Sequence, residues 1–308
     1  SQGFPDFDPP AALLDALAKV RELPHQYSTT YGSRKFRQAL AAKQSKHMGR
    51  TIDPENEIVV TCGSTEAMMA AMLTVCNPGD KVIIFSPFYE NYTADAILSG
   101  AEPIYVHLSP PEYGFDANKL EDAFKQGPKA LILCNPANPS GKVFTPEELK
   151  LIAHFAEKYD TYVITDEVYE HIIYAPYFHT YFASLPGMFQ RTISCSSLSK
   201  TYSITGWRLG YLIFPKKFTA VMQRIHQNFM ISANSFIQWA GIAQQDDPSK
   251  GIRAGDALFY TDASKTDVTN IRTDAQRAWM GKSAFPIYNV GISNEFKYKN
   301  LSLSFLLS

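Results

Sequence analysis

The sequence predicts an α/β protein built on a doubly wound, mostly parallel sheet, and three observations support this. Between about residues 57 and 215, short β-rich runs alternate with amphipathic stretches. Runs such as K-V-I-I-F-S (81–86) and A-L-I-L-C-N (130–135) are apolar on both faces, as in strands covered by helices on each side. A turn signal, N-P-G-D (77–80), separates two of these elements. Ligands of such sheets bind at the carboxyl ends of the strands, so residues that follow strands are the candidates for a site.

The individual elements follow from local patterns. Strands are predicted at 57–62, 81–86, 130–135, 162–167, 192–196 and 210–214. The run S-T-E-A-M-M-A-A-M-L-T-V after the first strand predicts a helix. Another helix begins after 144, where Thr145 and Glu148 form a capping box with Pro146 in the first turn. Its apolar residues recur at helical spacing: Leu149, Ile152, Ala153 and Ala156.

A chain of 308 residues fits one large domain, or one large and one small domain. We assign residues 25–245 to the large domain. Residues 1–24 and 246–308 are assigned to an N-terminal segment and a small α+β domain, which looks incomplete. D-D-P-S-K-G (246–251) is interpreted as a connection. Beyond it, strand-like runs are expected at 257–260 and 301–305, and a helix around 270–280.

Composition excludes several classes of function. The formal net charge of −1 gives no support for a nucleic-acid surface or a basic membrane patch. No apolar run reaches the roughly 18–20 residues of a membrane helix, and the N-terminus is unlike a signal peptide. The four cysteines have no C-x-x-C spacing, which favours buried thiols in a reducing compartment over disulfides or metal ligands. We therefore expect a cytoplasmic protein without a metal site.

The most informative segment is S-L-S-K-T-Y-S-I-T-G-W-R-L-G (197–210), which contains Lys200 and Arg208. A lysine amine can form an imine with an aldehyde cofactor, while hydroxyls and a guanidinium hold that cofactor's phosphate. The competing interpretation is a surface lysine in a loop rich in serine and threonine.

Four further motifs follow predicted strands. They are G-S-T-E-A (63–67), P-F-Y-E-N-Y (87–92), N-P-A-N-P-S-G (135–141) and D-E-V-Y-E (166–170). Free amides and hydroxyls at a helix start, here with Ser64 and Thr65, favour an anion. A carboxylate at a strand end, here Asp166, can pair with a protonated pyridine nitrogen. Each motif also has a structural explanation: a helix cap, a core aromatic residue or a turn.

Together, in this order, the motifs resemble those of the class I (fold-type I) aminotransferases, which use pyridoxal 5'-phosphate. The similarity is greatest to the branch with kynurenine, glutamine–phenylpyruvate, methionine and aspartate aminotransferases. It extends over most of the chain, from G-F-P-D-F (3–7) to H-Q-N-F-M-I-S-A-N-S (226–235).

The resemblance implies a role for each matching residue. Lys200 would form the imine and act as the base, Asp166 would hold the ring nitrogen, and Tyr89 would cover the ring. Tyr169 and Asn138 would bond the ring oxygen, while Gly3 and Asn138 would contact the substrate carboxylate. The phosphate would lie among residues from two segments of this chain and one of a partner in a homodimer: Ser64, Thr65, Ser197, Ser199 and Arg208, with Tyr27 from the partner.

The resemblance also implies the reaction. The amino group of an L-amino acid (aromatic, sulfur-containing or aspartate) would move to a 2-oxo acid by a ping-pong mechanism. A carbon–sulfur β-lyase and a cofactor-binding protein without catalysis stay open, because the same residues would serve them.

Two departures from the family bear on this choice. Ser302, in N-L-S-L-S-F (300–305), stands where the family has an arginine for the substrate carboxylate. The helical part of a small domain that the family has is also missing between Gln245 and about Gly251. This leaves an unusually compact variant or, as we favour, a chain with segments absent or misassigned.

Overall fold

A computed structural model describes residues 3–242, 259–260, 268–269, 292–298 and 301–307. The chain divides into two compact units, Ser1–Leu258 and Phe259–Ser308. The predicted helix around 270–280 and the predicted connection at 246–251 lie outside the described residues. The assignment of 25–245 to one domain stays a prediction.

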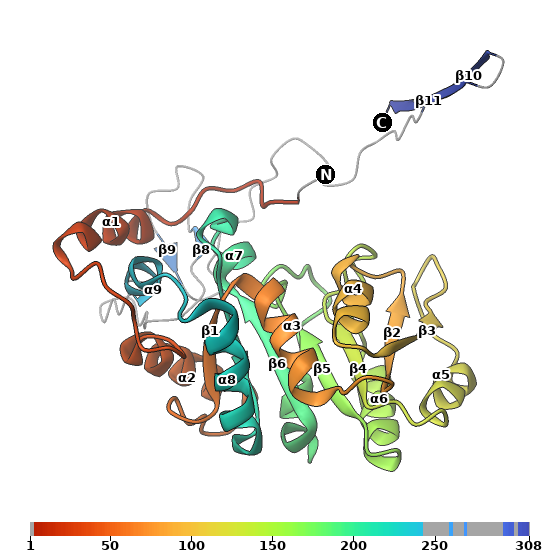
Figure 1. Cartoon of the computed structure of the whole chain (residues 1–308), viewed down its shortest axis with the longest axis horizontal. Coiled ribbons are helices and arrows are strands. Elements are labelled where there is room, and N and C mark those ends of the chain that lie inside the picture. Colours follow the sequence, from red (N-terminus) through yellow and green to blue (C-terminus); the bar gives the residue numbers. More distant parts are fainter. Residues whose placement is uncertain (1–2, 243–258, 261–267, 270–291, 299–300, 308) are drawn as a thin grey trace. The chain divides into compact units, whose positions relative to one another are not determined.

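The first unit contains all described helices and the main sheet (Figure 1). The helices are α1 (Ala11–Lys19), α2 (Arg34–Met48), α3 (Gly63–Val75), α4 (Asn91–Leu98), α5 (Ala117–Phe124), α6 (Pro146–Lys158), α7 (Leu198–Thr201), α8 (Thr219–Met230) and α9 (Ser235–Ile242). The strands are β1 (Ile58–Cys62), β2 (Lys81–Ser86), β3 (Glu102–His107), β4 (Ala130–Cys134), β5 (Tyr162–Asp166), β6 (Thr192–Ser197) and β7 (Leu209–Ile213). Short 3₁₀ turns are η1 (Val20–Glu22), η2 (Phe182–Ser184), η3 (Met188–Arg191), η4 (Thr205–Trp207) and η5 (Lys216–Phe218).

The seven strands form one sheet in the order β1-β7-β6-β5-β4-β2-β3. The pairs from β6 to β3 are parallel, whereas β7 is antiparallel to both of its neighbours, β1 and β6. Because β7 runs backwards, its amino end lies at the same edge as the carboxyl ends of the other strands. This edge therefore collects the segments that follow β1, β4, β5 and β6 and the one that precedes β7.

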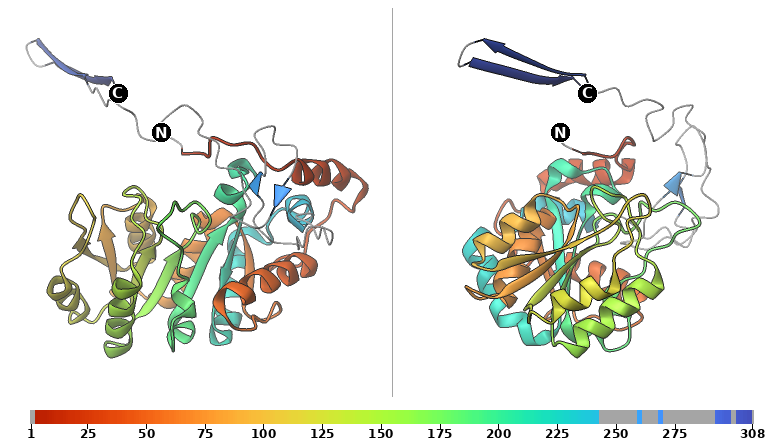
Figure 2. Two further views of the ribbon diagram at one scale, coloured as in Figure 1. Left: turned by 180° about the vertical axis from the view of Figure 1, so that it is seen from behind. Right: turned by 90° about the vertical axis from the view of Figure 1, so that its right-hand side faces the viewer.

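Helices cover both faces of the sheet (Figures 1 and 2). On one face, α3, α4 and α8 pack against alternate strand residues such as Ile84, Ile132 and Leu212. On the other face, α5 and α6 pack on residues such as Ile83 and Leu131, and α2 packs near β1 and β7. Burial on both faces explains the continuous apolar runs and confirms the predicted doubly wound sheet.

The predicted strands are confirmed, with ends that differ by at most one or two residues. The capping box of α6 is also present: Glu148 N–H donates to Thr145 Oγ1 at 3.2 Å, and Thr145 N–H donates to Glu148 Oε2 at 2.9 Å. Strand β3 was not predicted. It lies at the sheet edge, contains Pro103 and is partly exposed, so its pattern is weaker than that of an inner strand.

The second unit is described only as two pairs of strands. Strand β8 (Phe259–Tyr260) pairs with β9 (Val268–Thr269), and β10 (Ile292–Tyr298) pairs with β11 (Leu301–Leu307), both antiparallel. The strand-like runs predicted at 257–260 and 301–305 overlap β8 and β11. Ser302 lies opposite Lys297 in the register of β10 and β11. Within the described residues, no helix is both long and apolar enough to cross a membrane.

Gly210 allows the turn between β1 and α3 to pack closely on β7. A Cβ atom on Gly210 would lie 2.4 Å from the carbonyl carbon of Gly63 and 2.7 Å from the amide nitrogen of Ser64. Both are backbone atoms, which cannot rotate away as a side chain can. A glycine is therefore required where β7 meets this turn.

We expect Gly210→Ala to lower the free energy of unfolding by about 1–3 kcal/mol, because the added methyl group overpacks a rigid backbone contact. Urea denaturation would measure this as a lower midpoint with an unchanged slope. Gly114→Ala is the matched control, since a Cβ atom there meets nothing within 4 Å. Equal midpoints for the two variants would contradict the assignment.

Candidate active site

The turn from β1 into α3 carries the groups suited to an anion. Gly63 has a φ of +75°, and a Cβ atom there would lie 2.3 Å from Nη2 of Arg208. The absence of a side chain thus lets the guanidinium lie against the turn. Arg208 donates from Nη2 to Thr65 Oγ1 at 3.4 Å and from Nη1 to the carbonyl oxygen of Thr205 at 3.1 Å. Its side chain remains exposed, so further N–H groups are available to a ligand.

The two serines before Lys200 are both buried but have different surroundings. Ser197 caps α7, because its Oγ accepts the Ser199 N–H at 3.3 Å. Ser199 Oγ has no hydrogen-bond partner among the described residues. Buried hydroxyls usually have a hydrogen-bond partner, so a bound ligand could supply the partner that the Ser199 hydroxyl lacks.

Asp166 ends β5 and is only 6% exposed. Its Oδ2 accepts from the Tyr92 hydroxyl at 2.8 Å, and its Oδ1 accepts from the Val168 N–H at 3.3 Å. Burial raises the pKa of Asp166 to about 6, although these two hydrogen bonds and the charge of Lys200 act in the opposite direction. The carboxylate is therefore held in a fixed orientation within a poorly solvated pocket.

Lys200 lies on α7, on the same edge of the sheet, and is partly buried. Its Nζ lies 6.0 Å from the centre of the Tyr169 ring and donates to the carbonyl oxygen of Gly3. Burial lowers the pKa of Lys200 and the charge of Arg208 lowers it further, while Asp166 raises it. Burial and the charge of Arg208 therefore make the neutral amine of Lys200 easier to form than that of a free lysine.

Tyr89 and Tyr169 lie beside the same carboxylate. Burial raises the pKa of Tyr169 to about 12, and neighbouring Cys134, Asp166 and Tyr89 act in the same direction. Tyr89, just before α4, is 36% exposed and has its ring edge-on to Tyr92 at 5.8 Å between centres. Tyr169 is thus within electrostatic range of Asp166, and Tyr89 contacts Tyr92, the residue whose hydroxyl donates to Asp166.

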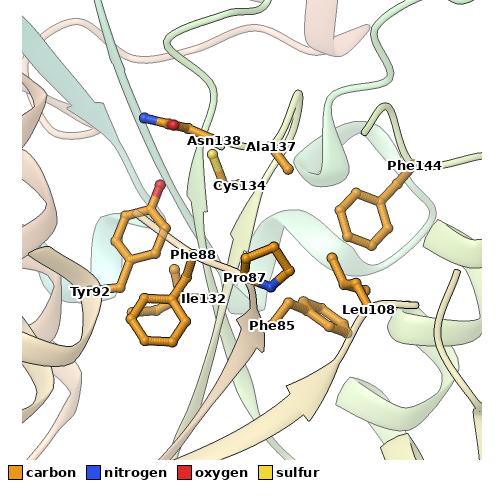
Figure 3. Close-up of a pocket in the computed structure, with 10 residues that line it drawn as sticks. All are labelled: Phe85, Pro87, Phe88, Tyr92, Leu108, Ile132, Cys134, Ala137, Asn138 and Phe144. Carbon is orange, nitrogen blue, oxygen red and sulfur yellow. The ribbon is translucent and has the colours of Figure 1, made fainter. Parts of the chain in front are cut away.

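A hollow joins several of these residues. Its walls come from the α3 start, the α4 start and the end of β5, and consist of Ser64, Thr65, Met68, Tyr89, Asn91, Tyr92, Asp95 and Asp166. A neighbouring apolar pocket contains Tyr92, Cys134 and Asn138 in its wall, with Phe85, Phe88 and Phe144 among its apolar members. In Figure 3 the Tyr92 hydroxyl points toward the side of the pocket where Cys134 and Asn138 lie. Tyr92 thus contributes to both spaces.

Two of the predicted site residues lie in the N-terminal part of the chain. Gly3 reaches the site through its carbonyl oxygen, which accepts from Lys200 Nζ. Tyr27 is 79% exposed and makes no hydrogen bond to the predicted site residues within the described part of the chain. The described contacts thus bring Gly3 to this site, but not Tyr27.

Two features of the site were not predicted from sequence. Tyr92 is the partner of Asp166, and it follows Tyr89 by three residues in the motif already singled out. The second feature is the pair of Glu66 and His226, whose contact is 2.5 Å across 160 positions of sequence. Helical spacing could have indicated Tyr92, but no local signal connects Glu66 with His226.

Comparison with known proteins gives a consistent result. The family model "Aminotransferase class I and II" matches residues 1–272. A bifunctional aspartate aminotransferase and glutamate/aspartate-prephenate aminotransferase of Petunia hybrida is 39% identical over 244 residues, or 78% of this chain and 51% of the relative. Mouse kynurenine–oxoglutarate transaminase 3 is 37% identical over 266 residues, or 80% of this chain and 58% of the relative.

Solved structures of aminotransferases are similar as well. An Escherichia coli protein with a methionine aminotransferase function has a TM-score of 0.75 at 34% identity, covering 78% of this chain and 63% of the other. N-Succinyldiaminopimelate aminotransferase of Mycobacterium tuberculosis has the same TM-score and coverage at 37% identity. The chain spans about half to three-fifths of the length of these curated relatives. It belongs to the class I and II aminotransferases, a family of fold-type I enzymes that use pyridoxal phosphate.

Proposed function

We propose that this chain carries the pyridoxal phosphate site of an aminotransferase that moves the amino group of an L-amino acid to a 2-oxo acid. The observation that carries the proposal is that a buried carboxylate, Asp166, and a partly buried lysine, Lys200, lie at the same edge of the sheet. Asp166 and Lys200 each perturb the other's pKa, and the anion-binding turn with Arg208 lies beside them. Titratable groups perturbed in this way are typical of catalytic sites.

The residues present fit the cofactor. Arg208, Thr65 and Ser64 offer a permanent charge, hydroxyls and the N-terminus of α3 to a phosphate, and the unpartnered Ser199 hydroxyl offers one more donor. Asp166 would hold the ring nitrogen, Tyr169 and Asn138 the ring oxygen, and Tyr89 one face of the ring. When bound, pyridoxal phosphate supplies an aldehyde for an amine and a protonated ring that accepts an electron pair.

Lys200 would attach the cofactor and then transfer protons. Attachment requires the unprotonated amine, and burial with the Arg208 charge shifts Lys200 toward that form. The same amine, once free, would take the α-proton of the substrate as a general base. Asp166 must be ionised to hold a protonated ring nitrogen, and the hydrogen bonds from Tyr92 and Val168 favour its ionised form.

The substrate class is proposed as an aromatic, sulfur-containing or aspartate amino acid. Similar proteins include aspartate aminotransferases, kynurenine transaminases and a protein with a methionine aminotransferase function, which span these three classes. Asn138 and Gly3 are the proposed contacts of the substrate carboxylate.

We further propose a cytoplasmic homodimer with shared active sites. Tyr27 is 79% exposed, which leaves its hydroxyl free to reach the phosphate of a partner subunit. All four cysteines are free thiols, and Cys76, Cys134 and Cys195 are buried, as is usual in a reducing compartment. Sedimentation analysis of the protein would test the dimer.

We expect Lys200→Ala to abolish covalent attachment of pyridoxal phosphate and to reduce amino transfer by about 10²–10⁴-fold or more, since it removes both the attachment point and the general base. Borohydride reduction followed by peptide mass analysis would detect the attachment in the unaltered protein. Lys150→Ala, an exposed residue on α6, is the control. Attachment that persists in Lys200→Ala would refute the assignment.

The same protein can be given single amino acids and a 2-oxo acid to identify the reaction. Amino transfer should yield the 2-oxo acid of the donor and a new amino acid from the acceptor. Release of ammonia and pyruvate from a sulfur-containing donor would instead indicate β-elimination.

We expect the affinity for pyridoxal phosphate to fall as the pH drops through about 6. Burial raises the pKa of Asp166 to about 6, so the carboxylate is present above that pH and lost below it. The cofactor's phosphate also titrates near pH 6, so the comparison with Asp166→Asn is essential. The difference in affinity between the two proteins should be largest above pH 7 and shrink toward pH 5. A constant difference would contradict a titrating Asp166.

A further inference from the structure

A charged Glu66 without a partner would place a negative charge where the proposed phosphate should bind. It lies in the first turn of α3, next to Ser64 and Thr65. Its Oε2 accepts from the Cys62 N–H at 2.6 Å, which holds the carboxylate close to the turn. A carboxylate there suits the helix dipole, but it would repel a phosphate at the same helix end.

The charge of Glu66 acts on the neighbouring Cys62 thiol. Burial raises the pKa of the Cys62 thiol, Glu66 raises it further, and Arg208 acts in the opposite direction. Both charges therefore act at Cys62, the residue directly before α3. A bare carboxylate would offset part of the attraction that Arg208 provides.

His226 on α8 contacts the other oxygen of Glu66. Its Nδ1 lies 2.5 Å from Glu66 Oε1 and its Nε2 lies 2.7 Å from the carbonyl oxygen of Thr30. The imidazole is completely buried, and the Glu66 side chain is only 9% exposed. Solvent thus screens the pair little, so whether it carries charge matters for a neighbouring anion.

The hydrogen-bond partners determine how many protons the pair holds. A carbonyl oxygen accepts only, so Nε2 of His226 carries a proton toward Thr30. The contact between Nδ1 and Oε1 needs a second proton, because two lone pairs at 2.5 Å would repel. With both protons present, the pair of Glu66 and His226 has no net charge.

We propose that His226 neutralises Glu66, so that the N-terminus of α3 can bind the phosphate of the cofactor while Glu66 still caps the Cys62 amide. His226 is a positioning residue, since it acts through Glu66 and not by touching the ligand. The second bond of His226, to the Thr30 carbonyl oxygen, also connects α8 to the segment three residues after Tyr27 in sequence. The inference rests on the proposed function, because it assumes that a phosphorylated cofactor binds here.

The test compares four forms of the full chain: unaltered, His226→Gln, Glu66→Gln, and the double variant. In His226→Gln the amide can still donate to Thr30, but Glu66 is left charged. We expect affinity for pyridoxal phosphate to fall about 5- to 10-fold, the size of a charge effect at a helix end. Adding Glu66→Gln to His226→Gln should restore most of the affinity, because it removes the uncompensated charge.

Pyridoxal without the phosphate is the second probe. It uses the same lysine and ring contacts, so its affinity should be nearly equal in all four forms. His154→Gln with Glu157→Gln on α6 is the matched control, since both residues are exposed and lie outside the proposed site. This control should leave both affinities unchanged.

Three outcomes would overturn the proposal. These are an unchanged affinity in His226→Gln, an equal loss for pyridoxal and pyridoxal phosphate, and a double variant as weak as His226→Gln. Failure of the unaltered protein to bind pyridoxal phosphate would instead refute the proposed function.

Glu66→Gln alone keeps the test decisive if His226→Gln does not fold. A glutamine can accept from Cys62 and donate to Nδ1 of a neutral His226, so every hydrogen bond can be kept. Affinity for pyridoxal phosphate should stay within about two-fold of the unaltered protein or increase. A loss of about ten-fold or more would show that the charge of Glu66 itself is needed, and would overturn the proposal.

Discussion

The parallel sheet with both faces covered is the constraint on which the rest of this structure depends. Strand β4, for example, is buried along its whole length, so its backbone groups must pair with neighbouring strands and its side chains are apolar. Polar chemistry is thereby concentrated where the strands end. Asp166 ends β5 at this edge, and Lys200 follows β6 there. The one reversed strand, β7, brings Arg208 to the same edge because its amino end lies there.

Close backbone approach makes this edge compact. Gly63 leaves room for the Arg208 guanidinium, and Gly210 leaves room for the Gly63–Ser64 backbone. Neither contact would tolerate a Cβ atom without movement of the turn. The position of the positive charge therefore depends on two residues that carry no side chain.

Electrostatic balance is the second theme of the site. Burial raises the pKa of Asp166 to about 6, and the hydrogen bonds from Tyr92 and Val168 act in the opposite direction. Burial likewise favours neutral Lys200, while the charge of Asp166 opposes this. In our proposal, Glu66 and His226 extend the same principle to the turn before α3, where they would form a buried pair without net charge.

The sequence by itself determined the strand positions, the capping box of α6 and the segments that meet at the sheet edge. These depend on short-range patterns: apolar runs, turn residues and motifs that follow strands. Resemblance to a family then supplied the roles proposed for Asn138, Asp166 and Lys200. Edge strand β3 was not predicted because partial exposure and Pro103 weaken its pattern.

Only the tertiary structure decided which groups act on one another. The bond from Tyr92 to Asp166 spans 74 positions and the contact of Glu66 with His226 spans 160. Such pairs, and the pKa shifts that burial produces, depend on distances that exist only after the helices pack on the sheet.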